Sequence, residues 1–197
     1  TAQIVAGGAL TNRGSLAAQN DLNVTAASVA NVAGAVLSHT GTLAVATPGA
    51  IDNRTGSLSG AKVDLGGASL DNSGGFVFSD GEASVGISGP LTNAAGQMLA
   101  VGDLGISAGA LDNRGGIALG RDVTLGVTSL DNSANGRIAA DRDLAVTAAG
   151  SIKNAGGTLS ANRDASVGAQ SLSNESGSLT AVGDLAFATP SSLTGAG

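Results

Sequence analysis

The residues of this chain that could take part in chemistry are a row of acidic side chains. They recur at multiples of about 20 positions, at Asp21, Glu82, Asp103, Asp122, Asp143, Asp164 and Asp184. Stacked carboxylates could hold Ca²⁺ between repeats, because Ca²⁺ takes oxygen ligands. However, the Gly-Gly-x-Gly-x-Asp pattern of Ca²⁺-binding repeats is absent. Arg also precedes the acid in three successive repeats, at Arg121, Arg142 and Arg163. We therefore interpret the row as a solvated turn with ion pairs between neighbouring repeats, and we assign no metal site.

Two carboxylate pairs, Asp141 with Asp143 and Asp80 with Glu82, could be read as the acid and base of a glycosidase. Both pairs lie in turns that recur along the chain, whereas a catalytic site needs its signature once. His39 is the only histidine, and the chain has no cysteine. A transition-metal site and an activated nucleophile would both need further partners of these kinds. We expect no catalytic residues and no cofactor, and an enzyme is the disfavoured interpretation.

Charge and composition argue against two further classes of partner. Acidic residues outnumber basic ones 15 to 9, which gives a net charge of −6 and opposes binding to nucleic acid. No run of about 18 apolar residues is present, so we expect no transmembrane segment. The chain opens with "TAQIVAGGALTN", which has neither the basic region nor the apolar region of a signal peptide. This opening is typical of the middle of a repeat, so we expect a fragment of a longer protein.

The elements that would position these side chains follow from an internal repeat. An Asn recurs at steps of 19 to 22 residues, always two places after an aliphatic residue and two to four places before a Gly. The row consists of Asn12, Asn31, Asn53, Asn72, Asn93, Asn113, Asn132, Asn154 and Asn174. Repeats of this length, each too short to bury its own apolar face, are typical of solenoids.

Each repeat contains short stretches in which apolar residues alternate with small or polar ones. In residues 137–154, "RIAADRDLAVTAAGSIKN", Ile138 and Ala140 share one side, and Leu144 and Val146 share it again after a turn. Ile152 then begins a third side. Alternation with period two predicts strands, and Gly every few residues is unfavourable in helices. Each repeat is therefore predicted to form two short strands and a short third side separated by turns.

Stacked coils of this kind predict an all-β fold, a right-handed parallel β-helix (solenoid) of about nine to ten rungs over residues 1–197. At about 4.8 Å per rung the rod would be about 45 Å long. Aromatic residues make up only 2% of the chain, so the core must be narrow and aliphatic. We expect Phe76 and Phe78 to fill the interior beside Ala-rich neighbours.

The recurring Asn is expected to be a corner device. Asn tolerates left-handed backbone better than most residues and bonds local backbone in turns. Asn amides stacked in successive rungs can also donate to one neighbour and accept from the other. We prefer this structural interpretation to a binding or catalytic role for the row.

Repeats such as "LDNRGGIALGRDVTLGVTS" and "LTNAAGQMLAVGDLGISAGA" resemble the haemagglutinin repeats of filamentous haemagglutinin and the stalks of contact-dependent growth-inhibition exoproteins. The resemblance covers essentially the whole chain. It implies a secreted protein at the surface of a Gram-negative cell, exported by two-partner secretion through an outer-membrane transporter. The expected function is a structural shaft that extends a tip or effector towards a host or neighbouring cell. The alternative is a module that binds a ligand or receptor along its side.

Overall fold

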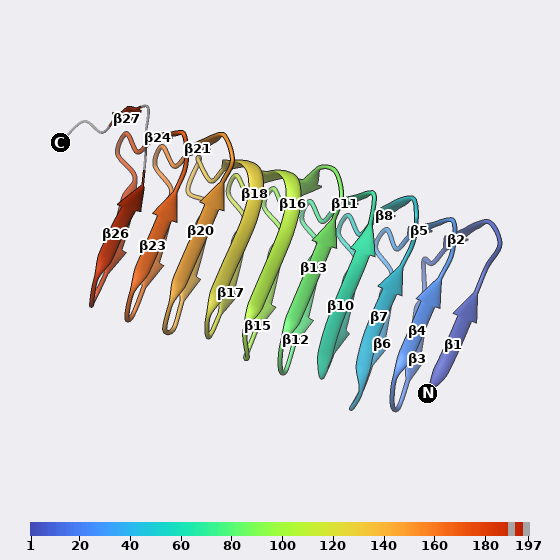
Figure 1. Ribbon diagram of the computed structural model, residues 1–197. Helices are drawn as coiled ribbons and strands as arrows, with labels where there is room; N and C mark the ends of the chain where they lie inside the picture. Colours follow the sequence, from blue (N-terminus) through green and yellow to red (C-terminus); the bar gives the residue numbers. More distant parts are fainter. Residues whose placement is uncertain (189–191, 195–197) are drawn as a thin grey trace.

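The computed structural model describes residues 1–188 and 192–194, and all regular elements in these ranges are β-strands. The chain coils repeatedly around one axis, and successive coils lie side by side from the N-terminus to the C-terminus (Figure 1). The coils form three faces, which we call face 1, face 2 and face 3 in chain order.

Face 1 contains the first strand of each coil. Its strands are β1 (Ala2–Val5), β4 (Leu22–Thr25), β7 (Thr42–Ala46), β10 (Lys62–Gly67), β13 (Ala83–Ile87), the first half of β16 (Leu104–Asp112), the first half of β18 (Val123–Asp131), β20 (Leu144–Ala148), β23 (Ala165–Gly168) and β26 (Leu185–Ala188).

Face 2 contains the short second strands, and β16 and β18 reach it without a break. The other strands of face 2 are β2 (Ala9–Thr11), β5 (Ser28–Ala30), β8 (Ala50–Asp52), β11 (Ser69–Asp71), β14 (Leu91–Thr92), β21 (Ser151–Lys153), β24 (Ser171–Ser173) and β27 (Ser192–Thr194).

Face 3 is a separate nine-stranded sheet. Its strands have four residues each and are β3 (Ser15–Ala18), β6 (Ala35–Ser38), β9 (Ser57–Gly60), β12 (Phe76–Ser79), β15 (Gln97–Ala100), β17 (Ile117–Gly120), β19 (Arg137–Ala140), β22 (Thr158–Ala161) and β25 (Ser178–Ala181).

Every strand pairs in parallel with the equivalent strand of the next coil. The aliphatic residue before each row Asn forms one column along the axis, in the order Leu10, Val29, Ile51, Leu70, Leu91, Leu111, Leu130, Ile152 and Leu172. The all-β parallel β-helix predicted from the repeat is therefore confirmed, and the coil is right-handed (Figure 1).

The interior is a narrow stack of aliphatic side chains. Leu43, Leu58, Met98, Leu104 and Ile138 are among its largest fully buried members. The inward column of face 1 ends at Leu185 and Phe187, which pair with the buried Ala165 and Val167 of the preceding coil but are themselves 40% and 42% exposed. Burial in this fold thus requires a neighbouring coil on both sides.

The prediction that Phe76 and Phe78 fill the interior is wrong. Both are only partly buried, whereas Val77 between them is fully buried. Strand alternation explains the difference, because Val77 lies in register with the buried Leu58 and Met98. The two Phe side chains therefore point outwards, in register with positions that hold Ser57 and Ser59 in the previous coil.

If alternate residues of β20 point into the core, Asp substitutions at Leu144 and Thr147 should differ sharply in their effect on the free energy of unfolding. Replacing Leu144, which is 1% exposed, by Asp places a charge in the aliphatic core and should lower the free energy of unfolding by more than about 3 kcal/mol. Thr147→Asp in the same strand is the control, because Thr147 is exposed. Urea unfolding followed by circular dichroism measures both, and equal unfolding midpoints would refute the assignment.

Candidate functional site

The row of Asn side chains lies at the corner between face 2 and face 3 and forms a continuous hydrogen-bonded ladder. Each Nδ2 donates to Oδ1 of the Asn in the next coil, over eight successive bonds of 2.7 to 2.8 Å. Seven of the nine side chains, from Asn31 to Asn154, are at most 1% exposed. The predicted amide ladder is therefore confirmed.

The ladder also satisfies the local backbone. Asn113 Nδ2, for example, donates to the Gly116 carbonyl at 3.2 Å as well as to Asn132. Among the described residues, no buried side-chain nitrogen or oxygen lacks a hydrogen-bond partner. The amides are thus occupied in holding adjacent coils together, as a structural role requires.

The left-handed residue of the corner is not the Asn, so that part of the expectation is wrong. Apart from Asn135, which lies three places after Asn132, the positive φ angles fall two places after a row Asn, where the side chain varies. The residues at this position are Ala33, Thr55, Gly74, Ala95, Gly115, Ala134, Gly156 and Ser176. Asn is placed at its own position by the hydrogen bonds of its buried amide and not by its backbone conformation.

The Gly that lies three or four places after a row Asn, such as Gly116 after Asn113, is required for a different physical reason. A Cβ on Gly116 would overlap the carbonyl oxygen of Asn93 in the previous coil and would lie 2.7 Å from Oδ1 of Asn113. The same overlap with the preceding coil recurs at Gly56, Gly75, Gly96, Gly136, Gly157 and Gly177. These glycines allow the coils to approach closely at the corner, and they are needed for space and not for a positive φ.

The acidic row lies in the turn between face 3 and face 1, where it forms a second ladder. Arg121 binds Asp103 of the previous coil through two hydrogen bonds, at 2.9 and 3.0 Å. Two more pairs, Arg142 with Asp122 and Arg163 with Asp143, repeat this arrangement. The ion pairs expected between neighbouring repeats are therefore confirmed.

The carboxylates of this second ladder also bond to backbone. Asp103 Oδ1 accepts the Asp122 N–H at 3.3 Å, and Asp164 Oδ1 accepts the Asp184 N–H at 2.9 Å. The hydrogen bond from Arg142 holds the pKa of Asp122 below its ordinary value, and Arg163 does the same for Asp143. Because these groups are on the surface, each ion pair contributes little to stability.

The other chemical candidates are isolated side chains. Asp141, Asp80, Glu82 and His39 are exposed in turns, and Asp143 is engaged by Arg163. Over residues 1–188 and 192–194, no group of three or more His, Cys, Asp or Glu side chains could hold a metal ion. In the same ranges, no helix is long and apolar enough to cross a bilayer.

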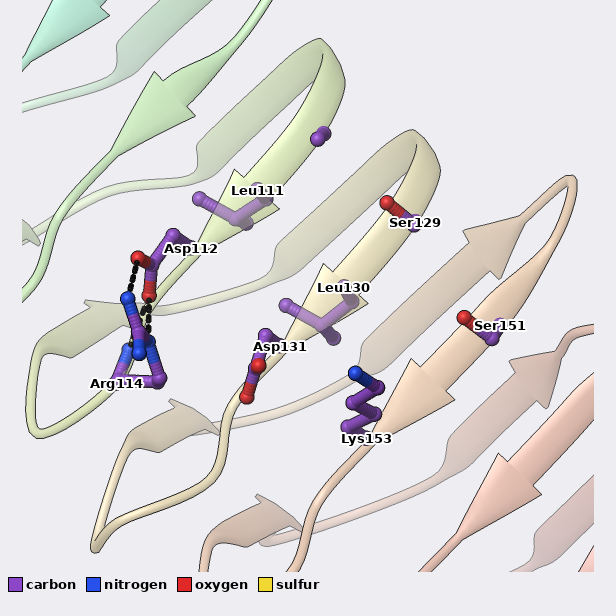
Figure 2. Close-up of a pocket in the computed structure, with 9 residues that line it drawn as sticks. Leu111, Asp112, Arg114, Ser129, Leu130, Asp131, Ser151 and Lys153 are labelled. Atoms are coloured by element: carbon purple, nitrogen blue, oxygen red, sulfur yellow. Dashed lines mark hydrogen bonds and ion pairs between the residues drawn. The ribbon is translucent and has the colours of Figure 1, made fainter.

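An open hollow of about 240 Å³ lies on face 2 across β16, β18 and β21, and Figure 2 shows its lining. Arg114 folds back onto Asp112 through bonds of 2.9 and 2.6 Å, so its charge is compensated within the same coil. In the next two coils, the position of Asp112 is occupied by Asp131 and then by Lys153. The Asp-Asn-Arg arrangement recurs at Asp52 and Arg54, which marks it as a repeated turn and not as a unique site.

The corner geometry predicts opposite tolerances for two adjacent glycines. Gly115→Ala should lower the free energy of unfolding by only about 1 kcal/mol, because Ala33, Ala95 and Ala134 adopt the same left-handed backbone. Gly116→Ala should cost about 3 kcal/mol or more, because its Cβ overlaps the previous coil. Urea unfolding of the two variants measures the difference, and equal costs would contradict the close-approach explanation.

The lowered pKa values of Asp122 and Asp143 predict a loss of stability in acid. A carboxyl whose pKa is lower in the folded chain than in the unfolded chain stabilises the fold above the unfolded value of about 3.9. That contribution disappears as the pH falls through the folded pKa. The urea midpoint should therefore stay level from about pH 7 to 5 and fall below about pH 4. Asp122→Asn combined with Asp143→Asn should make the fall of the urea midpoint below about pH 4 less steep. An unchanged fall would contradict the attribution of the acid sensitivity to these two carboxyl groups.

Comparison with known proteins gives one match. A family model described as haemagglutinin repeat matches residues 1–55, 41–86 and 77–185, and these segments overlap to cover the chain from residue 1 to residue 185. Searches of curated proteins and of solved structures gave no match. The matched segments contain the Asn ladder, the corner glycines and the Arg–Asp pairs described above. The chain belongs to the haemagglutinin-repeat family.

Proposed function

We propose that this chain is a shaft segment of a filamentous, adhesin-like surface protein, and that residues 1–197 form a single β-helical unit of it. The observation that carries the proposal is the unbroken register from coil to coil. The steps between row Asn residues differ by at most three positions, so no repeat carries a long insertion that could form a separate site. A uniform rod of this kind is suited to setting the distance between the parts of a protein at its two ends.

Three continuous features stiffen the rod along its axis. Parallel ladders follow all three faces, the aliphatic column fills the interior, and the Asn ladder fixes one corner. Because each coil contacts only its neighbours, length can change by whole coils without altering the rest. Each coil adds about 4.8 Å to the reach of the shaft.

The wider setting of the shaft is part of the same proposal and is supported by the family. We place the chain in a protein at the surface of a Gram-negative cell, exported by two-partner secretion with an outer-membrane transporter as its partner. In this setting the shaft holds a tip or an effector away from the cell, towards a host or a neighbouring bacterium, as in adhesins and contact-dependent inhibition proteins.

Removing whole coils tests the modular shaft. Deletion of residues 93–131 joins Thr92 to Asn132 and excises two repeats in register. The shortened chain should remain strand-rich by circular dichroism, and small-angle scattering should show a rod shorter by about 10 Å. Collapse of the whole chain into an unfolded state would contradict a modular shaft.

A binding assay separates the shaft from the side-on module. The purified chain is titrated onto glycan arrays and onto host and bacterial cells, with unlabelled chain as competitor. A shaft shows no saturable, competable binding. Saturable binding that the unlabelled chain displaces would favour the side-on binding module instead.

A further inference from the structure

The outer side of face 3 carries a cluster of large apolar side chains that the core does not use. This face 3 apolar patch consists of Phe76, Phe78, Leu99, Ile117 and Leu119. In register across β12, β15 and β17, Phe78 aligns with Leu99 and Leu119, and Phe76 aligns with Gln97 and Ile117. All five side chains are partly exposed, and the two Phe rings stack with their centroids 5.8 Å apart.

None of the five side chains belongs to the buried core of the described residues. The inward positions of the same three strands are filled by Val77, Met98 and Ala118, which are buried. One coil earlier, β9 forms the same face with serines at the outward positions. A hollow of about 310 Å³ lies beside Phe78, Leu99 and Leu119, and Val101 at its edge is 64% exposed. A contiguous apolar surface rimmed by polar residues is typical of an interaction site.

We propose that face 3 is a pairing surface for a second copy of this chain. The two copies are related by a twofold axis that runs along β15 in the plane between the faces, so the shafts lie antiparallel. This axis places β12 of one copy over β17 of the other. The Phe76 and Phe78 side chains then lie over Ile117 and Leu119 of the second copy, and Leu99 lies over Leu99. The patch is thus complementary to itself, as a twofold interface requires.

The distribution of charge favours face 3 over the rest of the surface as the site where two copies associate. The chain carries a net charge of −6, which opposes association of two copies through most of its surface. The outward positions of the nine face 3 strands contain a single charged residue, Arg137. The proposed axis sets Arg137 over Ser57 of the other copy, so no like charges meet.

The area of face 3 reaches the lower limit for a specific interface. Nine strands of four residues, at about 3.3 Å per residue and 4.8 Å between strands, cover about 570 Å² on each copy. Two such faces bury about 1,100 Å² in total, and a specific interface needs about 1,000 Å². Flat sheets pack face to face at a separation of about 10 Å.

Sedimentation equilibrium of the chain tests the pairing. The expected result is a concentration-dependent dimer of the 18.6 kDa chain. Phe76→Ser combined with Phe78→Ser introduces the residues that β9 carries at the equivalent positions. This double substitution should raise the dissociation constant of the dimer about tenfold or more. The control is Val5→Ser, which removes an apolar residue of β1 on face 1 that is 68% exposed and should leave the dimer unchanged.

A distance measurement tests the axis without altering the patch. The chain has no cysteine, so Ala17→Cys in β3 accepts a single nitroxide spin label. The antiparallel pair places the two labels about 40 Å apart, across eight strand spacings, whereas a parallel pair brings them together. A chain that stays monomeric up to about 100 μM, a dimer that the two serines leave intact, or a short label distance would each overturn the proposal.

Discussion

A buried carboxamide must find its hydrogen-bond partners inside the protein, and eight of the nine row Asn residues, from Asn12 to Asn154, are buried. This requirement holds the coils in register. Asn93, Asn113 and Asn132 each donate to the next amide along the axis. A slip of one residue would leave each buried donor and acceptor unpaired, at a cost of about 1–3 kcal/mol for each group. The corner glycines complete the constraint, because the coils can approach closely only where no Cβ intervenes.

Once the corner is fixed, the rest of each coil is free to vary at the surface. The aliphatic columns follow from the register, because period-two alternation then sets the same side of every strand inwards. Turn lengths, exposed Arg–Asp pairs and outward side chains can change from coil to coil without disturbing the axis. A shaft with a constant interior and a variable exterior can therefore carry a local surface such as the face 3 apolar patch.

The repeat made the fold and the Asn ladder predictable, because both depend on residue type at a fixed interval. The inward column from Leu10 to Leu172 and the Arg–Asp pairing followed from the same spacing. The outward position of Phe76 and Phe78 differs from the expectation because large aromatic side chains suggest a place in the core, whereas strand alternation decides the side. Val77, in register with Leu58 and Met98, takes the inward position between them. The left-handed position could not be read from residue type, because Ala, Thr, Ser and Gly all occupy it.

The most direct test of the central constraint is the unfolding free energy of Asn113→Ala compared with that of Asn162→Ala, measured by urea unfolding. Asn113 is 1% exposed and accepts from Asn93 at 2.8 Å, whereas Asn162 is exposed in a turn. Removing the Asn113 amide takes away one of the two acceptors of Asn93 Nδ2, leaving only the Ile117 carbonyl, and it removes the donor to Asn132 Oδ1. The ladder predicts a loss of more than about 2 kcal/mol for Asn113→Ala and a change within about 0.5 kcal/mol for Asn162→Ala. Equal unfolding free energies for the two variants would contradict it.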